Sequence, residues 1–296
     1  MSLGVLNNIA AVYAENNLNS TQASLQNTLE QLSSGSRINS GADDAAGLSI
    51  ADGLGAASAA LTQSADNATQ GVGLLQVADG ALSQVTNLLN RAVTLATEAS
   101  NGTLSTSQDA AANQEFQSIL AEINNIGTTT TFNGNSVFSG NAVTVYSGDA
   151  TTTGGATDAL TIAALTSASV GDVGGTVTST GTAISYTVGT GEDLSADVLT
   201  SATAAQTALT DVNTAITDVA AQRGYVGSQI NTLNAISSVD STEQENVLSA
   251  QNSIQATDYG QATSNLSKYE ILSQTGISAL AQANSTQQMV TKLLQQ

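Results

Sequence analysis

Apolar residues recur at intervals of three and four along several long stretches of this chain, a spacing typical of one face of an α-helix. The longest row is Leu61, Ala65, Ala68, Val72, Leu75, Ala78, Leu82, Val85, Leu89 and Ala92. It predicts a helix over 45–99, which would be roughly 80 Å long at about 1.5 Å per residue. Asn101-Gly102 is a plausible stop, and a shorter helix is expected over 112–127.

A similar row marks the second half of the chain. Its members are Leu209, Val212, Ile216, Val219, Arg223, Val226, Ile230 and Leu233. Arg223 is the one charged member of this row. Burial of an unpaired guanidinium is costly, so Arg223 either pairs with a carboxylate or faces solvent, and the pattern leaves both open.

The two ends of the chain carry further apolar positions at helical spacing. They are Leu18, Leu25, Leu29, Leu32, Tyr269, Leu272, Ala279, Ala283, Val290 and Leu293. Small residues in the C-terminal row allow helices to approach closely. We therefore expect the two ends to lie side by side.

The middle of the chain differs in composition, because it is rich in Thr, Ser and Gly between about 141 and 200. Alternating apolar and polar residues over 143–146 and 184–188 predict short strands. The expected fold is mainly α: long antiparallel helices in a coiled-coil rod formed by both chain ends, with a small β-rich outer insertion that forms a modest surface module.

The amino-acid composition excludes several classes of function. The 296 residues include no Pro, Cys, Trp or His, and the balance of Lys plus Arg against Asp plus Glu is 5 to 24, a net charge of −19. This charge argues against nucleic acid and anionic membranes as partners, and no apolar run is long enough for membrane insertion. Without His or Cys, the usual nucleophilic and zinc chemistry lacks its groups, so we expect no enzyme, cofactor or metal.

Several motifs resemble those of bacterial flagellins, in the right order. The stretch 32–51, Leu-Ser-Ser-Gly-Ser-Arg-Ile-Asn-Ser-Gly-Ala-Asp-Asp-Ala-Ala-Gly-Leu-Ser-Ile-Ala, is similar to their N-terminal signature. Thr131-Phe132-Asn133-Gly134-Asn135 resembles a turn of the family. The C-terminal matches are Ala256-Thr257-Asp258-Tyr259, Leu280-Ala281-Gln282-Ala283-Asn284 and Leu293-Leu294.

The resemblance implies three domains. Residues 1–42 with 257–296 would form a terminal coiled-coil tube that is disordered in the free monomer. The apolar residues of the two ends, from Leu18 to Leu32 and from Tyr269 to Leu293, are then the candidate polymerisation residues, which become buried on self-association. Residues 43–140 with 203–256 would form a helical rod, and 141–202 a variable outer domain. The start of the chain lacks a basic stretch followed by an apolar run, so we expect no standard signal peptide and, from the resemblance, type III export.

The implied function is a structural subunit that polymerises into the bacterial flagellar filament for swimming motility. Implied partners are other copies of the chain, the flagellar export apparatus, a secretion chaperone at the C-terminal segment, and the filament cap and hook-junction proteins. The protein would be secreted and extracellular. Two alternatives stay open: a hook–filament junction protein and a surface-displayed binding module.

Two sets of residues are further site candidates. The first is a signature loop with Arg37, Asn39, Asp43 and Asp44. We expect both aspartates to cap the following helix, and Arg37 either to contact a neighbouring subunit or to be solvated. The second set is Arg91, Leu95 and Glu115, which align with positions that an innate Toll-like receptor recognises in some flagellins; ordinary helix packing is the alternative.

Overall fold

The computed structural model describes residues 8–148, 157–172, 176–180 and 183–294. The chain divides into two compact units. The terminal unit consists of Met1–Ala56 with Val247–Gln296, and the central unit is Ala57–Asn246. Both boundaries fall inside long helices, α2 (Ala45–Ser100) and α4 (Ala202–Gln255). The positions 42/43 and 256/257 predicted from the sequence instead mark loops between helices.

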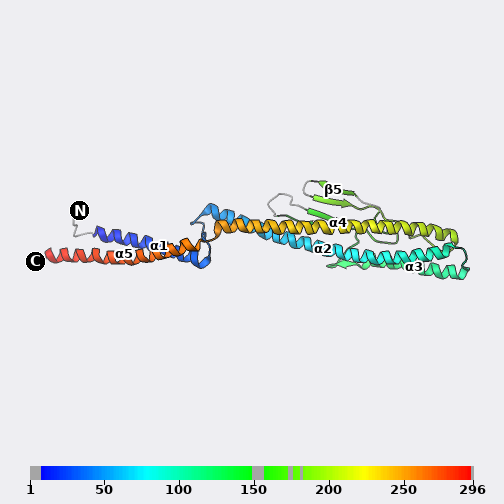
Figure 1. The fold of residues 1–296 in the computed structure, drawn as a ribbon, viewed down its shortest axis with the longest axis horizontal. Coiled ribbons are helices and arrows are strands. Elements are labelled where there is room, and N and C mark those ends of the chain that lie inside the picture. Colours follow the sequence, from blue (N-terminus) through cyan, green and yellow to red (C-terminus); the bar gives the residue numbers. More distant parts are fainter. Residues whose placement is uncertain (1–7, 149–156, 173–175, 181–182, 295–296) are drawn as a thin grey trace. The chain divides into compact units, whose positions relative to one another are not determined.

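The terminal unit contains the two helices at the ends of the chain, α1 (Ile9–Ser34) and α5 (Tyr259–Leu294), which lie side by side (Figure 1). They are antiparallel, because Asn8 Nδ2 donates to the Ala283 carbonyl at 3.1 Å while Leu18 lies at Gly276. A Cβ atom at Gly276 would come within 3.3 Å of Leu18 Cδ1. The predicted pairing of the chain ends is therefore confirmed, and a small residue permits the close approach.

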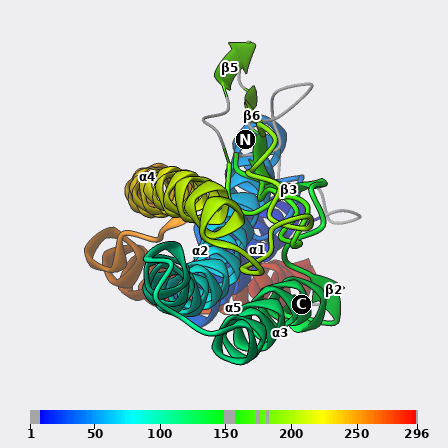
Figure 2. The same cartoon turned by 90° about the vertical axis from the view of Figure 1, so that its right-hand side faces the viewer.

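Three helices form the frame of the central unit (Figure 2). They are α3 (Thr106–Thr129) and the parts of α2 and α4 within this unit. α2 and α4 are antiparallel, as shown by hydrogen bonds from Gln244 to Thr62 and from Arg223 to Asp79. α2 ends at Ser100, and Gly102 follows with φ 65°, a left-handed conformation that suits glycine.

The buried face of α2 follows a strict heptad pattern. Its fully or almost fully buried members are Leu61, Ser64, Ala68, Gly71, Leu75, Ala78, Leu82, Val85, Leu89, Ala92, Ala96 and Ala99. The sequence prediction was wrong at Ala65 and Val72, which are only half-buried. Ser64 is buried instead, and its hydroxyl donates a hydrogen bond to the Asp240 carboxylate. Gly71 is buried as well, because its lack of a side chain leaves room for Leu233; a Cβ there would lie 2.9 Å from Leu233 Cδ1.

α4 shows the same regularity. Its buried heptad positions include Ala205, Ala208, Val212, Ala215, Val219, Gln222, Val226, Gln229 and Leu233. The predicted members Leu209, Ile216 and Ile230 are half-buried at the edge of the core. Small and amide residues thus occupy positions for which the apolar pattern favoured larger neighbours.

A two-stranded hairpin follows α3. Its strands are β1 (Thr131–Phe132) and β2 (Asn135–Ser136), paired antiparallel. Asn133 and Gly134 join them with φ of 51° and 80°. Two successive positive φ values characterise the tight turn that Asn-Gly favours, so the turn predicted from this sequence is confirmed.

A four-stranded sheet occupies the middle of the chain, in the order β3-β4-β6-β5. The strands are β3 (Ala142–Tyr146), β4 (Thr157–Thr161), β5 (Thr176–Thr180) and β6 (Ala183–Thr187). β3 and β5 are antiparallel to their neighbours, whereas β4 and β6 pair in parallel. The two predicted strands correspond to β3 and β6.

The segment around this sheet packs closely on the helices, more than a modest surface module would. Its buried apolar side chains are Leu160, Ile162, Leu165, Val170, Leu194 and Leu199. Two glycines allow the approach: a Cβ at Gly127 of α3 would overlap the Leu165 carbonyl, and one at Gly171 would lie 2.5 Å from the Val219 amide nitrogen. This packing was not predicted from the sequence, because it is made by glycines and aliphatic residues and the segment has few large apolar side chains.

Candidate assembly surfaces

The apolar side chains of α1 and α5 are poorly covered. Leu18, Leu25, Leu32 and Tyr269 are half-buried, as is Ala283, whereas Ala279 is exposed. Leu29 and Leu272 are 48% and 43% exposed. Val290 and Leu293 belong to α5, but their side chains lie outside the described residues. Most of the predicted polymerisation residues thus retain apolar surface that another copy can cover.

Sequence reasoning missed further exposed apolar residues on the same helices. They are Ile9, Val12, Tyr13, Ile271, Ile277 and Met289, each more than half exposed. A pair of helices covers only one face of each member, so residues just beside the paired stripe stay in solvent. Apolar residues outside the predicted rows are a sequence signal for additional apolar surface, but which of them stay exposed depends on the pairing of the two helices.

The junction between α4 and α5 is pinned by the loop that follows α1. Arg37 donates from its guanidinium to the Ile254 carbonyl at 2.6 Å and from its backbone to the Gln255 carbonyl at 2.7 Å. These carbonyls belong to the last turn of α4, where backbone acceptors lack helical partners and the helix dipole favours a cation. Arg37 therefore makes an intramolecular contact, and its proposed contact with a neighbouring subunit stays a prediction.

The same junction supplies the start of α5. The Asp258 side chain accepts from the Gln261 backbone N–H at 3.1 Å, and Thr257 N–H donates to the Gly35 carbonyl at 3.0 Å. Gly35 has φ 71°, and a Cβ there would lie 2.9 Å from the Tyr259 hydroxyl. The Asp-Tyr element thus combines a helix cap with a contact at the end of α1.

Asp43 and Asp44 have different roles. Asp44 caps α2, since its side chain accepts from the Gly47 backbone N–H at 2.9 Å. Asp43 closes the loop before it by accepting from the backbone of Asn39 and from both the backbone and hydroxyl of Ser40. Hydrogen bonds from Asn39 and Ser40 lower the pKa of the Asp43 carboxyl. The prediction that both cap the helix is correct for Asp44 and wrong for Asp43. Asn39 itself donates to the Ser36 carbonyl.

Arg91 of α2 and Glu115 of α3 form an exposed ion pair at 2.7 Å. Their hydrogen bond lowers the pKa of the Glu115 carboxyl and raises that of Arg91. Leu95 is only 3% exposed and belongs to the core. Arg91 and Glu115 are therefore accessible in the single chain and Leu95 is not; recognition by an innate receptor stays a prediction.

Arg223 pairs with Asp79 across α2 and α4, with Nε to Oδ1 at 2.8 Å and Nη2 to Oδ2 at 3.4 Å. Both side chains are more than a third exposed. Of the two possibilities left by the sequence, a carboxylate partner is present, and the pair lies at the rim of the core.

Neither a metal site nor a membrane span emerges from the described residues. In that part of the chain no three acidic, His or Cys side chains are grouped so as to hold a metal ion. None of the helices, over the residues described, combines the length and apolarity needed to cross a bilayer.

Two family models match this chain. The bacterial flagellin N-terminal helical region matches residues 5–143, and the bacterial flagellin C-terminal helical region matches residues 209–294. The unmatched interval contains most of the sheet and its connections.

Individual relatives agree with these models. A flagellin of Listeria monocytogenes is 32% identical over 295 residues, covering 97% of this chain and 98% of that protein. Flagellin B of Vibrio cholerae is 39% identical over 140 residues, 47% of this chain but only 37% of the Vibrio protein. A crystal structure of Bacillus cereus flagellin is 27% identical and covers 59% of this chain and 88% of that one, with a TM-score of 0.45. On the two family models and the full-length Listeria match, this chain belongs to the bacterial flagellin family.

Proposed function

We propose that this protein is a structural subunit that polymerises through its terminal helices into an extracellular flagellar filament for swimming motility. The observation that carries the proposal is the exposed apolar surface of the α1–α5 pair, with Tyr13 68% and Ile271 64% exposed. Monomeric proteins rarely leave many large apolar side chains on one helix pair. Full burial of a Leu, Ile or Val side chain stabilises by about 1.5–3 kcal/mol, so contact with further copies supplies the driving force.

The terminal helices fold on assembly. An isolated pair of helices with little mutual burial gains too little to offset an ordering cost of about 1–2 kcal/mol per residue in backbone entropy. In the free subunit, residues 1–42 and 257–296 are accordingly disordered, and they become a coiled-coil tube when neighbours cover their apolar faces. Residues 43–140 with 203–256 form the rod layer, and 141–202 the outer domain.

Net charge modulates this association. Copies that each carry a charge of −19 repel one another, so salt that screens these charges promotes polymerisation. Arg37 and the loop with Asn39 lie on the exposed side of the α4–α5 junction and provide a contact between neighbouring subunits.

The other partners follow from family membership. The chain leaves the cell through the flagellar export apparatus, a chaperone holds its C-terminal segment beforehand, and the cap and hook-junction proteins bound the filament. Matches to flagellins along both helical regions favour the filament subunit over a junction protein.

The test is negative-stain electron microscopy of the purified chain after addition of precipitating salt or filament seeds. A chain lacking residues 1–40 and 258–296 serves as the comparison. We expect filaments from the full chain only. Filaments from the shortened chain would show that the terminal helices do not drive assembly. Absence of filaments from both chains would exclude a self-polymerising subunit.

A further inference from the structure

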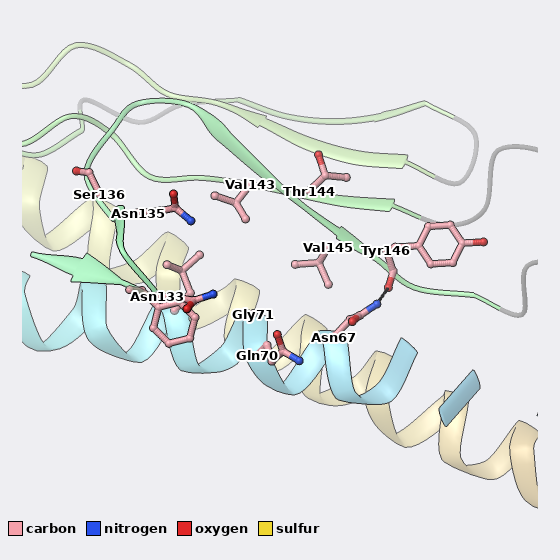
Figure 3. Close-up of a pocket in the computed structure, with 12 residues that line it drawn as sticks. Asn67, Gln70, Gly71, Asn133, Asn135, Ser136, Val143, Thr144, Val145 and Tyr146 are labelled. Atoms are coloured by element: carbon pink, nitrogen blue, oxygen red, sulfur yellow. Dashed lines mark hydrogen bonds between the residues drawn. The ribbon is translucent and has the colours of Figure 1, made fainter. Parts of the chain in front are cut away.

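A cavity of about 330 Å³ lies in the central unit between α2, the β1–β2 hairpin and β3 (Figure 3). α2 lines it with Asn67, Gln70, Gly71 and Leu74, a spacing that places them on one helix face. The consecutive residues 143–146 of β3 line the opposite side. Because side chains alternate along a strand, β3 borders the cavity with its edge, consistent with its place at the end of the sheet. The volume is at the lower end of the range of about 300–1,000 Å³ for small-molecule sites.

Among the residues that the structure describes, the lining of this cavity contains no Asp, Glu, Lys or Arg. A charged ligand would therefore be desolvated without a counter-charge, which is unfavourable. Anions would also be repelled by the net charge of −19. These two facts favour an uncharged ligand.

The polar groups around the cavity are mostly side-chain amides. Among the described residues, those of Gln70, Asn133 and Asn135 have no hydrogen-bond partner. An amide both donates and accepts, as does a hydroxyl. Asn133 occupies the turn with φ 51°, so the backbone fixes the direction of its Cα–Cβ bond while its amide keeps its hydrogen-bonding groups available. Such groups match a ligand that carries several hydroxyls.

The floor of the cavity is apolar. Leu74 and Val145 are 7% exposed each, and Val143 and Val145 point from β3 toward α2 in Figure 3. The Phe132 ring packs against α2 at Gly73, where a Cβ would lie 3.6 Å from two ring carbons. At Gly71 a Cβ would lie 3.1 Å from Val145 Cγ2, so glycine lets β3 approach the helix. Gly71 and Gly73 thus shape the floor of the cavity.

We propose that this cavity binds an uncharged sugar. The C–H face of a pyranose ring packs on Phe132 and the valines, and its hydroxyls exchange hydrogen bonds with Gln70, Asn133 and Asn135. A purely apolar ligand fits less well, because it would desolvate these amides without giving them partners. The proposal concerns a binding activity separate from polymerisation.

The test uses the full chain as a monomer, with ligand-observed NMR and calorimetric titration. The probes are N-acetylglucosamine, methyl glucoside and, as the anionic counterpart, glucuronate. We expect saturable binding of at least one neutral sugar and at least ten-fold weaker binding of glucuronate. Asn135→Asp and Gln70→Glu, which replace amide donors by carboxylates of the same size, should each weaken neutral-sugar binding at least ten-fold. The control Asn124→Asp, on an exposed position of α3, should leave it unchanged.

Three results would overturn the proposal. One is no binding of any neutral sugar up to its solubility limit. Another is sugar binding that is unchanged in both Asn135→Asp and Gln70→Glu, because the sugar would then bind outside this cavity. The third is preferential binding of a short uncharged peptide, such as acetyl-Thr-Val-Thr-amide, which would assign the exposed edge of β3 to strand addition. Circular dichroism of each variant separates loss of binding from loss of fold.

Discussion

The helix pairs α1–α5 and α2–α4 are both antiparallel, and the apolar positions of both are mostly Ala, Leu, Ile and Val, yet they bury these residues to different extents. Along α2 the heptad positions from Leu61 to Ala99 are all buried, including the polar position Ser64 and the glycine position Gly71. On α1 and α5 comparable residues, such as Leu29 and Leu272, are 48% and 43% exposed. The central pair is covered by α3 and the sheet segment, and the terminal pair has no such cover in a single chain.

This difference indicates where a polymer gains its free energy. A helix pair whose core is closed gains little from a neighbour, whereas one with open apolar faces gains about 25 cal/mol per Å² of apolar surface that a neighbour covers. Polar detail follows the same division. In the central unit, some buried polar groups make specific contacts: the Ser64 hydroxyl donates to the Asp240 carboxylate, and the Gln222 side-chain N–H donates to the Ala163 carbonyl. The terminal helices carry their hydrogen bonds mainly along their own backbones.

The largest expected effect comes from a charge placed on the exposed apolar surface of the α1–α5 pair. Leu25→Asp places a carboxylate on a half-buried apolar position of α1, and burying it in the assembled tube without a partner is strongly unfavourable. We expect loss of filaments by electron microscopy, with an unchanged thermal unfolding transition of the free chain. Leu272→Asp on α5 should behave alike.

The matched control is Asn27→Asp, which adds the same charge at an exposed polar position of the same helix. It should still assemble. Normal filaments from Leu25→Asp, or equal loss from Asn27→Asp, would show that burial of this apolar face does not drive assembly.

The next comparison makes one chemical change in both pairs. Leu82→Ala removes a side chain that is 0% exposed, so we expect the free energy of unfolding of the monomer to fall by about 2–5 kcal/mol. Leu29→Ala, at a position 48% exposed, should change monomer stability by no more than about 0.5 kcal/mol. Its effect should appear as a higher critical concentration for polymerisation. Denaturant titration and sedimentation measure the two quantities, and equal monomer destabilisation by both variants would contradict the contrast.

Much of this architecture could be predicted because helical periodicity is local. The rows on α2 and α4, the stop at Gly102 and the turn at Asn133-Gly134 all depend on neighbouring residues. The errors have a common origin. The pattern favoured the apolar residue of two neighbours, Ala65 over Ser64 and Val72 over Gly71, whereas the fold buries Ser64 as a hydrogen-bond donor to Asp240 and Gly71 as space for Leu233 of α4. Such choices depend on a partner distant in sequence.

The candidate sites show the same limit. Asp44 was predictable as a cap because its partner Gly47 is three residues away. Arg37 was not predictable as a ligand of the Ile254 carbonyl, since that contact joins residues 217 positions apart. The exposure of Ile271 and Ile277 could not be read from periodicity either, because it depends on which face α1 covers.

A smaller expected effect is on the pH dependence of stability, where the carboxyl groups of Asp197 in the central unit and Asp43 in the terminal unit have pKa values shifted in opposite directions. Burial, followed by the charge and hydrogen bond of Asp211 and the charges of Glu192 and Asp193, raises the pKa of Asp197 from 3.8 to about 6. The folded chain therefore binds more protons than the unfolded chain between these values, and this contribution makes the protein less stable as pH rises through them. Asp197→Asn removes the charge, so it should gain about 1–2 kcal/mol of stability relative to the wild type above pH 6 after allowance for solvent screening, and nothing below pH 3.8. Denaturant titrations across this range measure it.

For Asp43 in the terminal unit, the expected change of stability with pH has the opposite sign. Its pKa is lowered by hydrogen bonds from Asn39 and Ser40, so its contribution is present above its usual value and lost on acidification. In the assembled filament, where Asn39 and Ser40 are ordered, Asp43→Asn should therefore lower resistance to depolymerisation most at neutral pH and have no effect in acid. Parallel pH profiles for Asp197→Asn and Asp43→Asn would contradict the assigned environments.

The smallest expected effect concerns the start of α2, at the boundary between loop and helix. Asp44→Ala removes the acceptor of the Gly47 N–H, which should cost about 0.5–2 kcal/mol locally. Asp44→Asn keeps an oxygen acceptor of the same shape and should retain most of the cap. Hydrogen exchange of the amides of residues 45–48 resolves this, because protection there should fall in the alanine variant while amides of the closed core around Leu82 stay unchanged. Loss of protection throughout α2 would instead mean that its first turn and its core unfold as one unit, and that the contrast between the two units does not extend to their stability.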